Sequence, residues 1–181
     1  MDSHRFTGFA GVSFRVQSPA ETVNKQALIQ KVVEKLTADL ALYFKAATIA
    51  RAEATHEQSK AENKYDTRGL EASYLARGQS KQAAEIEVSI HQIAAMEPKN
   101  FKLGAPIDLG AYVEIENRGE TSRYFVAARA GGTEIVVDAL EIMVITPQSP
   151  LGRQLMGHRQ GESPQLEIGD RRSVHKILCV A

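Results

Sequence analysis

Acidic residues gather in one polar stretch of the chain, residues 54–78, where their carboxylates could hold a metal ion. Glu57, Glu62 and Asp66 are interleaved there with lysine and arginine residues. Mg²⁺ prefers hard oxygen ligands and usually takes only one or two carboxylates from a protein. Exposed ion pairs contribute about 0–1 kcal/mol to stability, so stability gives a weak reason for the cluster. These three residues are candidate catalytic carboxylates; the alternative is a solvated charged surface, the commoner role of such a run.

Two segments with helical spacing flank this stretch and would position it. Apolar residues recur at steps of three and four from Asn24, a suitable helix N-cap, to the mid-50s, and again from about Thr67 to Met96. Pro98 ends the second segment. The first stripe consists of Ile29, Val32, Leu36, Leu40, Tyr43, Ala47 and Ala50, and the second of Leu75, Ala83, Ile86, Ile90 and Ile93.

Two facing stripes that run in opposite directions predict an antiparallel two-helix coiled coil over residues 24–97, with the acidic stretch at its tip. A helix rises about 1.5 Å per residue, so an arm of this length would extend roughly 50 Å. Residues 1–23 show neither helical spacing nor alternation. We expect this segment to be a disordered tail, or to precede a true translation start at Val23.

Residues 98–181 change to the alternating pattern of β-strands. Asn117–Gly119 and Gly131–Gly132 mark turns, and a short helical turn is expected at residues 152–156. Strands are expected at residues 112–116, 123–128, 134–137, 141–145, 165–168 and 174–180. The pattern predicts a small, mainly antiparallel β domain, which makes the whole chain an α+β protein. Cys179 falls in the last alternating run and is expected to be a small core residue.

Charge and composition exclude several classes of protein. The 22 basic residues equal the 22 acidic ones, and residues 24–97 and 98–181 each carry ten of either sign. A domain that grips phosphates usually has a basic excess, so we expect no direct sequence-specific nucleic-acid binding. The single cysteine excludes an intrachain disulfide and fits the reducing cytoplasm. No apolar run approaches the roughly 18–20 residues that cross a membrane, and we expect no membrane partner.

Two motifs resemble the bacterial Gre-type transcription elongation factors. ITPQSPLGRQLMGHRQGE, residues 145–162, is similar to the segment where a Ser-Pro loop leads into a small helix and a glycine-containing turn. AENKYDTRGLEA, residues 61–72, is similar to the acidic tip of the family's coiled coil. The resemblance covers roughly residues 24–181. It implies a coiled-coil arm followed by an FKBP-like β domain at residues 98–181.

The resemblance also implies a function and a partner. The β domain would dock at the rim of the RNA polymerase secondary channel through Ser149, Pro150 and Leu151, with Leu151 exposed as a small hot spot. The arm would pass down the channel and bring Glu62 to a magnesium ion shared with the polymerase, which would cleave its own backtracked RNA. The factor would bind no cofactor alone and would not itself be an enzyme.

The tip departs from the family pattern at one position, and this keeps alternatives open. Ser59 stands where cleavage-active members carry aspartate, and Glu57 or Asp66 would have to substitute for it. A factor with such a tip could instead occupy the channel and inhibit, or compete with cleavage factors. A pure interaction module, in which the coiled coil binds another helix, is a further alternative.

An FKBP-like fold also invites a peptidyl-prolyl isomerase or chaperone, which needs an apolar, aromatic-lined pocket. The chain has no tryptophan, and residues 98–181 offer four aromatic residues for such a pocket: Phe101, Tyr112, Tyr124 and Phe125.

Overall fold

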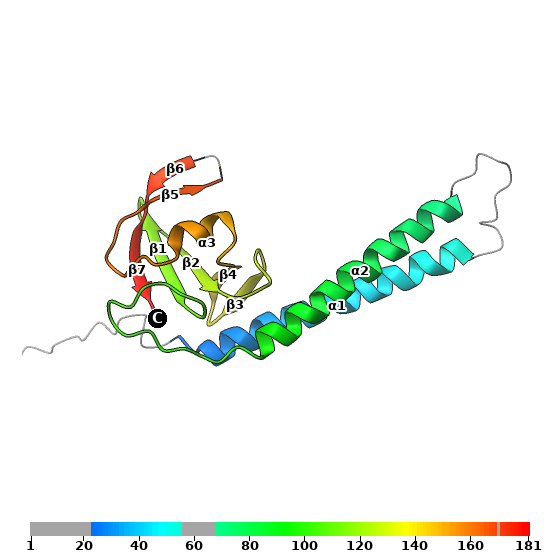
Figure 1. Ribbon diagram of the computed structural model, residues 1–181, viewed down its shortest axis with the longest axis horizontal. Helices are drawn as coiled ribbons and strands as arrows, with labels where there is room; N and C mark the ends of the chain where they lie inside the picture. Colours follow the sequence, from blue (N-terminus) through cyan, green and yellow to red (C-terminus); the bar gives the residue numbers. More distant parts are fainter. Residues whose placement is uncertain (1–22, 56–67, 170) are drawn as a thin grey trace, which may run out of the picture.

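The computed structural model describes residues 23–55, 68–169 and 171–181. Two long helices, α1 (Lys25–Thr55) and α2 (Arg68–Ala94), form a pair that extends away from a C-terminal β domain (Figure 1). The predicted order, a helical pair followed by a mostly antiparallel sheet, is therefore confirmed. The expected tail or alternative start at residues 1–23 lies, up to residue 22, outside the described residues. In the described ranges, neither helix is long and apolar enough to cross a membrane.

The apolar stripes hold α1 and α2 together, as their spacing predicts. Asn24 caps α1, because its Oδ1 accepts a hydrogen bond from the amide of Ala27 at 3.1 Å. The stripe residues Ile29, Val32, Leu36, Ala50, Ala83, Ile86 and Ile93 are buried. Leu75 was expected in the second stripe, but it is 54% exposed. In that half of α2 the half-buried positions are Ala76 and Gln79, which continue the spacing of Ala83 and Ile86, so Leu75 lies beside the interface.

The β domain contains a five-stranded sheet, a separate hairpin and one short helix. The sheet has the order β3-β4-β2-β1-β7, and its only parallel pair among the described strands is β2 with β4. Helix α3 (Pro150–Leu155) follows β4 directly. The strands of the sheet are β1 (Tyr112–Asn117), β2 (Glu120–Val126), β3 (Glu134–Val137), β4 (Leu140–Ile145) and β7 (Lys176–Val180), while β5 (Gln165–Ile168) and β6 (Arg171–Val174) form the hairpin.

The last predicted strand, residues 174–180, corresponds to β7 from Lys176 onward, whereas Val174 ends β6, a strand of the other sheet that was not predicted. β6 ends at Val174 and pairs with β5, whereas β7 begins at Lys176 and pairs with β1. Between them, the amide of His175 donates to the carbonyl of Pro164 at 3.0 Å. No glycine or proline marks the break at Val174, His175 and Lys176, so the sequence pattern alone did not indicate the change of partner.

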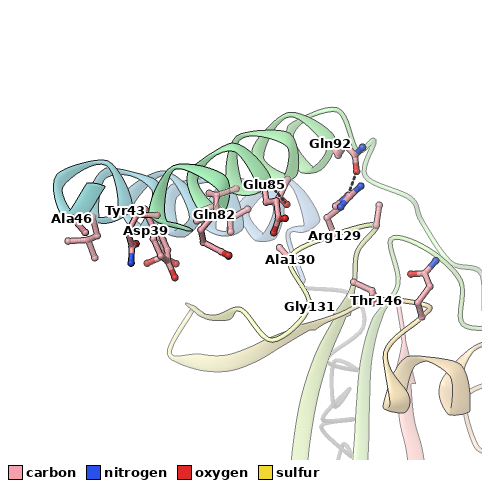
Figure 2. A pocket seen from close by; sticks show the side chains of 17 residues that line it. Asp39, Tyr43, Ala46, Gln82, Glu85, Gln92, Arg129, Ala130, Gly131 and Thr146 are labelled. Atoms are coloured by element: carbon pink, nitrogen blue, oxygen red, sulfur yellow. Dashed lines mark hydrogen bonds between the residues drawn. The ribbon is translucent and has the colours of Figure 1, made fainter. Parts of the chain in front are cut away.

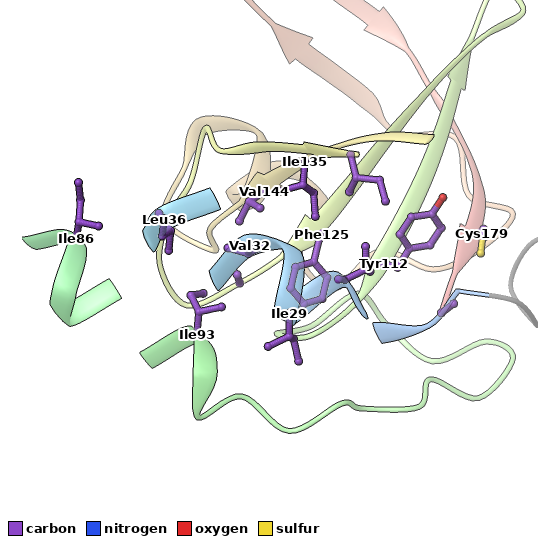
Figure 3. Close-up of a cluster of buried hydrophobic side chains, with 14 residues drawn as sticks. Ile29, Val32, Leu36, Ile86, Ile93, Tyr112, Phe125, Ile135, Val144 and Cys179 are labelled. Atoms are coloured by element: carbon purple, nitrogen blue, oxygen red, sulfur yellow. The ribbon is translucent and has the colours of Figure 1, made fainter. Parts of the chain in front are cut away.

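The sheet buries apolar side chains on both of its faces. On one face, Tyr112 and Phe125 pack with Val32 and Leu36 of α1 and Ile93 of α2 (Figure 3). On the other face, the alternating residues Val113, Ile115, Tyr124 and Val126 pack with Leu155 of α3 and Leu166 of β5. The end of the helical pair nearest the sheet, here called the root of the arm, is thus part of the same hydrophobic core as the sheet. This shared core fixes the arm to the β domain.

A buried lysine adds a polar contact at the root of the arm. Lys25, in the first turn of α1, is only 7% exposed. Its ammonium group donates to the carbonyl of Lys99 and lies 4.4 Å from the centre of the Phe101 ring. Both contacts favour the charged form, although burial lowers the pKa of Lys25 to about 8. The first turn of α1 is in this way joined to the segment that follows α2.

Candidate docking site at the root of the arm

A groove of about 1070 Å³ lies in the angle between the helical pair and the β domain. Figure 2 shows the helices along one side and the loop around Ala130 and Gly131 on the other. The helical side is mostly polar and includes Asp39, Tyr43, Gln79, Gln82, Glu85, Ser89 and Gln92. The β domain contributes residues 128–131, Thr146 and Gln148. The groove therefore combines the root of the arm with the start of the motif at residues 145–162.

The loop between β2 and β3 forms one wall and is tied to the arm. Arg129 donates from its Nε to the Oε1 of Gln92 on α2 at 2.8 Å. Ala130 has a φ of 65°, in the left-handed region, and packs against the core cluster at the root of the arm. A Cβ added to Gly131 would lie 3.2 Å from the Cγ2 of Thr146, so this wall closely approaches the next loop. The wall is held in place by contacts on both sides.

The turn from Thr146 into α3 has a fixed geometry, and Thr146 and Gln148 line the groove. The Ser149 hydroxyl donates to the carbonyl of Thr146 at 2.8 Å and accepts from the amide of Gly152 at 3.0 Å. Ser149 is thereby the N-cap of α3, and Pro150 occupies the first turn, where a missing amide hydrogen costs nothing. A Cβ at Gly152 would lie 1.9 Å from the Thr146 carbonyl oxygen. The Ser-Pro-Leu-Gly order is therefore what this tight loop-to-helix turn requires.

The three predicted docking residues lie in this turn, but none of them is among the residues that line the groove, and their exposure differs. Pro150 is exposed, whereas Ser149 is half-buried with its hydroxyl used in the cap. Leu151 was expected to be exposed, but it is half-buried and packs against the second core cluster beneath α3. Its side chain is drawn inward because the tight turn places α3 directly on the sheet. Gln148, which sequence reasoning overlooked, is exposed and lines the groove.

The charges of the groove are mixed. Asp39 is paired with Lys35 on the same helix at 2.6 Å. Glu85 has no ion pair among the described residues, and it faces the wall that carries Arg129. Sequence reasoning missed Glu85 and Arg129, because they belong to separate elements and only the folded chain places both along one groove. A groove with amide, hydroxyl and both kinds of charged group suits a polar protein surface better than a nucleic-acid backbone.

The predicted tip residues, by contrast, cannot be placed. Glu57, Ser59, Glu62 and Asp66 lie outside the described residues. α1 ends at Thr55 and α2 begins at Arg68, so these residues connect the outer ends of the two helices (Figure 1). Within the described ranges, no three histidine, cysteine, aspartate or glutamate residues come together as a metal site. The magnesium site at Glu62 remains a prediction.

Other reactive groups of the β domain are part of its interior. Cys179 is buried, as predicted, and burial raises the pKa of its thiol to about 11, so the thiolate is not formed near neutral pH. The Tyr112 hydroxyl donates to Glu114 at 2.6 Å, and Arg123 lies 3.2 Å from the same carboxylate oxygen. Burial and the hydrogen bond to Glu114 raise the pKa of Tyr112. These groups form a satisfied buried network rather than a reactive site.

The aromatic residues give no support to the isomerase alternative. Tyr112 and Phe125 are at most 1% exposed, and Tyr124 is 7% exposed. Phe101 packs against the second core cluster and lies beneath the ammonium group of Lys25. An isomerase pocket needs aromatic side chains that remain open to a substrate. In the described part of the chain, all four are instead engaged in packing.

Comparison with known proteins gives structural similarity but no match of sequence. No protein-family model matches the chain, and no curated protein matches it. The structure is similar to GreA factor homolog 1 (Gfh1) of Thermus thermophilus, with 25% identity over 82% of this chain and 94% of that chain and a TM-score of 0.36. Gfh1 of Thermus aquaticus gives 23% identity, 83% and 94% coverage and a TM-score of 0.36.

A third similar structure is the prokaryotic transcription elongation factor GreA/GreB from Nitrosomonas europaea. It shares 15% identity, covers 61% of this chain and 91% of its own length, and gives a TM-score of 0.33. Because all three TM-scores are below 0.5, these similarities by themselves support neither a mechanism nor a partner for this chain.

Proposed function

We propose that this protein is a Gre-like factor that binds RNA polymerase at the rim of its secondary channel and modulates elongation. The resemblance of residues 145–162 to the Gre-type motif suggests the partner. The observation that carries the proposal is the position of that motif: its first residues line the groove at the root of the arm. A docking surface there, with the arm extending beyond it, is the arrangement that such a factor needs.

The arm acts as a spacer between docking and chemistry. α1 has 31 residues and α2 has 27. At 1.5 Å per residue, α1 is about 45 Å long, enough to carry its tip well beyond the docked β domain. The hydrophobic core that joins the root of the arm to the sheet sets the direction of the arm. Binding at the groove therefore determines where the tip arrives in the partner.

At the tip, we propose that Glu62 contributes a ligand to a magnesium ion shared with the polymerase, with Glu57 or Asp66 beside it. Two metal ions about 4 Å apart stabilise the attacking and leaving oxygens of a phosphoryl transfer. The polymerase would supply the remaining ligands and carry out the cleavage, so the factor itself is not an enzyme. Its cytoplasmic location follows from this partner.

One observation favours a second candidate function. Ser59 replaces the aspartate of cleavage-active members, and a neutral hydroxyl is a weaker magnesium ligand than a carboxylate. In this variant of the proposal, the factor docks in the same way, but its tip occupies the channel and blocks cleavage factors. Docking is common to both candidates, whereas the effect on cleavage distinguishes them.

Docking is tested by measuring the affinity of the full chain for purified bacterial RNA polymerase. Glu85→Arg places a long cation in the groove, and Glu87→Arg makes the same change on an exposed residue of α2 outside it. We expect Glu85→Arg to weaken binding about tenfold or more, since a misplaced charge in an interface costs 1.4 kcal/mol or more. Glu87→Arg should leave the affinity unchanged. An unmodified chain that does not bind the polymerase would contradict the proposal.

A further inference from the structure

The end of the β domain away from the arm contains a second hollow, between two hairpins. The turn between β1 and β2 lies beside the β5–β6 hairpin, which Figure 1 shows on the side of the sheet remote from α1 and α2. The Nδ2 of Asn117 joins the two hairpins by donating to the Ser173 hydroxyl at 2.7 Å. The space between them is a pocket of about 640 Å³.

The floor of this pocket is a fixed polar network around one buried histidine. His175 is 6% exposed and makes a hydrogen bond through each ring nitrogen. Its Nδ1 donates to the Ser173 carbonyl at 3.0 Å, which leaves Nε2 to accept from the Asn117 amide at 3.1 Å. The same amide lies 3.3 Å from the carbonyl of Val174. The two hairpins are thus held in one geometry without any ligand.

The rim of the pocket is basic, although the domain as a whole is electrically balanced. Arg118, Arg171 and Arg172 line it, against one acidic lining residue, Glu120. Arg172 makes a long, exposed ion pair with Glu167 at 3.4 Å. Arg118 and Arg171 have no ion pair among the described residues. Within the described residues, these two guanidinium groups are in no ion pair, and they line a preformed pocket where they can bind an anion.

Arg118 is also an unfavourable residue for the turn in which it lies. Its φ of 53° is in the left-handed region, followed by Gly119 at 88°. A residue with a Cβ is strained there, and glycine or asparagine would form the same turn more easily. The turn itself gives no reason for an arginine. Arg118 lines the pocket together with Arg171 and Arg172.

We propose that this pocket binds a phosphate-type polyanion through Arg118, Arg171 and Arg172. The planar guanidinium group donates paired hydrogen bonds that match phosphate oxygens, and several of them close together neutralise a multiply charged group. The ligand has the chemistry of linked phosphates, either a free pyrophosphate group or the backbone of a single-stranded nucleic acid. This site lies apart from the groove at the root of the arm, and its test does not depend on polymerase binding.

The test is calorimetric titration of the full chain with sodium pyrophosphate, and separately with a short single-stranded RNA. The pocket variant is Arg118→Gln with Arg171→Gln. The control variant is Arg77→Gln with Lys81→Gln, which removes two exposed positive charges from α2, outside this pocket. Thermal unfolding of all three proteins checks that the fold is kept.

We expect saturable binding of pyrophosphate that weakens about tenfold or more in the pocket variant, since the variant removes charge-assisted hydrogen bonds to the phosphate oxygens. The control should bind as the unmodified chain does. Tighter binding of RNA than of pyrophosphate, with the same loss in the pocket variant, would support the proposal and identify a nucleic-acid backbone as the ligand. Absence of binding to both probes, or equal losses in the two variants, would overturn it.

Discussion

At the scale of single residues, the Ser-Pro-Leu-Gly turn shows how a motif can be dictated by backbone geometry. Ser149 closes the turn with two hydrogen bonds, and Gly152 leaves room for the carbonyl of Thr146. The sequence indicates a loop and a short helix here, and both are present. It could not indicate that Leu151 turns inward or that Gln148 faces a groove, because both depend on the sheet beneath α3.

Two glycines provide a matched test of this geometry. Alanine at Gly152 would place its Cβ 1.9 Å from a backbone oxygen, and we expect it to lower the free energy of unfolding by about 1–3 kcal/mol or more. Gly78 lies within α2 and has no atom within 4 Å of an added Cβ. Gly78→Ala should instead raise the free energy of unfolding by about 1 kcal/mol through helix propensity. Urea denaturation measures both, and equal effects of the two changes would contradict the proposed role of Gly152.

At the scale of elements, much of the architecture follows from periodicity. The helical stripes and the alternating runs predict α1, α2 and most strands, because burial of one face imposes its own spacing. β6 was missed, since strand partners are not encoded in alternation. The groove at the root of the arm was also missed, because it forms only where α1 and α2 meet the loop at residues 128–131. Residue spacing predicts each helix or strand separately, but it does not predict which elements pair or what sites form where they meet.

The junction between α1 and the segment after α2 should be sensitive to pH. Burial lowers the pKa of Lys25 from 10.5 to about 8 in the folded protein. Between these values the unfolded chain binds more protons than the folded one, so the free energy of unfolding rises with pH. We expect a rise of about 1 kcal/mol from pH 7.5 to 9 that is absent in Lys25→Met.

Urea denaturation at several pH values measures this difference between the two proteins. The window ends at pH 9 because burial also raises the pKa of Cys179 to about 11, and that shift acts with the opposite sign at higher pH. Lys31→Met, at an exposed position of α1, should keep the rise. An unchanged pH dependence in Lys25→Met would show that Lys25 keeps an ordinary pKa in the folded protein.

At the scale of the whole molecule, the proposed function depends on the distance between two regions. The groove lies at the root of the arm, and the candidate carboxylates connect the outer ends of its helices. Binding of a partner at the groove can set the position of the outer end of the helices only if the root of the arm is fixed to the β domain. The shared core of α1, α2 and the sheet supplies that fixed root.

The most direct test of the central claim is RNA cleavage in stalled, backtracked elongation complexes, with the unmodified chain and with Glu62→Ala. The account predicts that the unmodified chain binds these complexes and stimulates cleavage, and that Glu62→Ala binds equally well but loses the stimulation. Binding without stimulation, together with competition against a cleavage factor, would support channel occupancy instead. A chain that neither binds the complexes nor changes the cleavage rate would contradict the account.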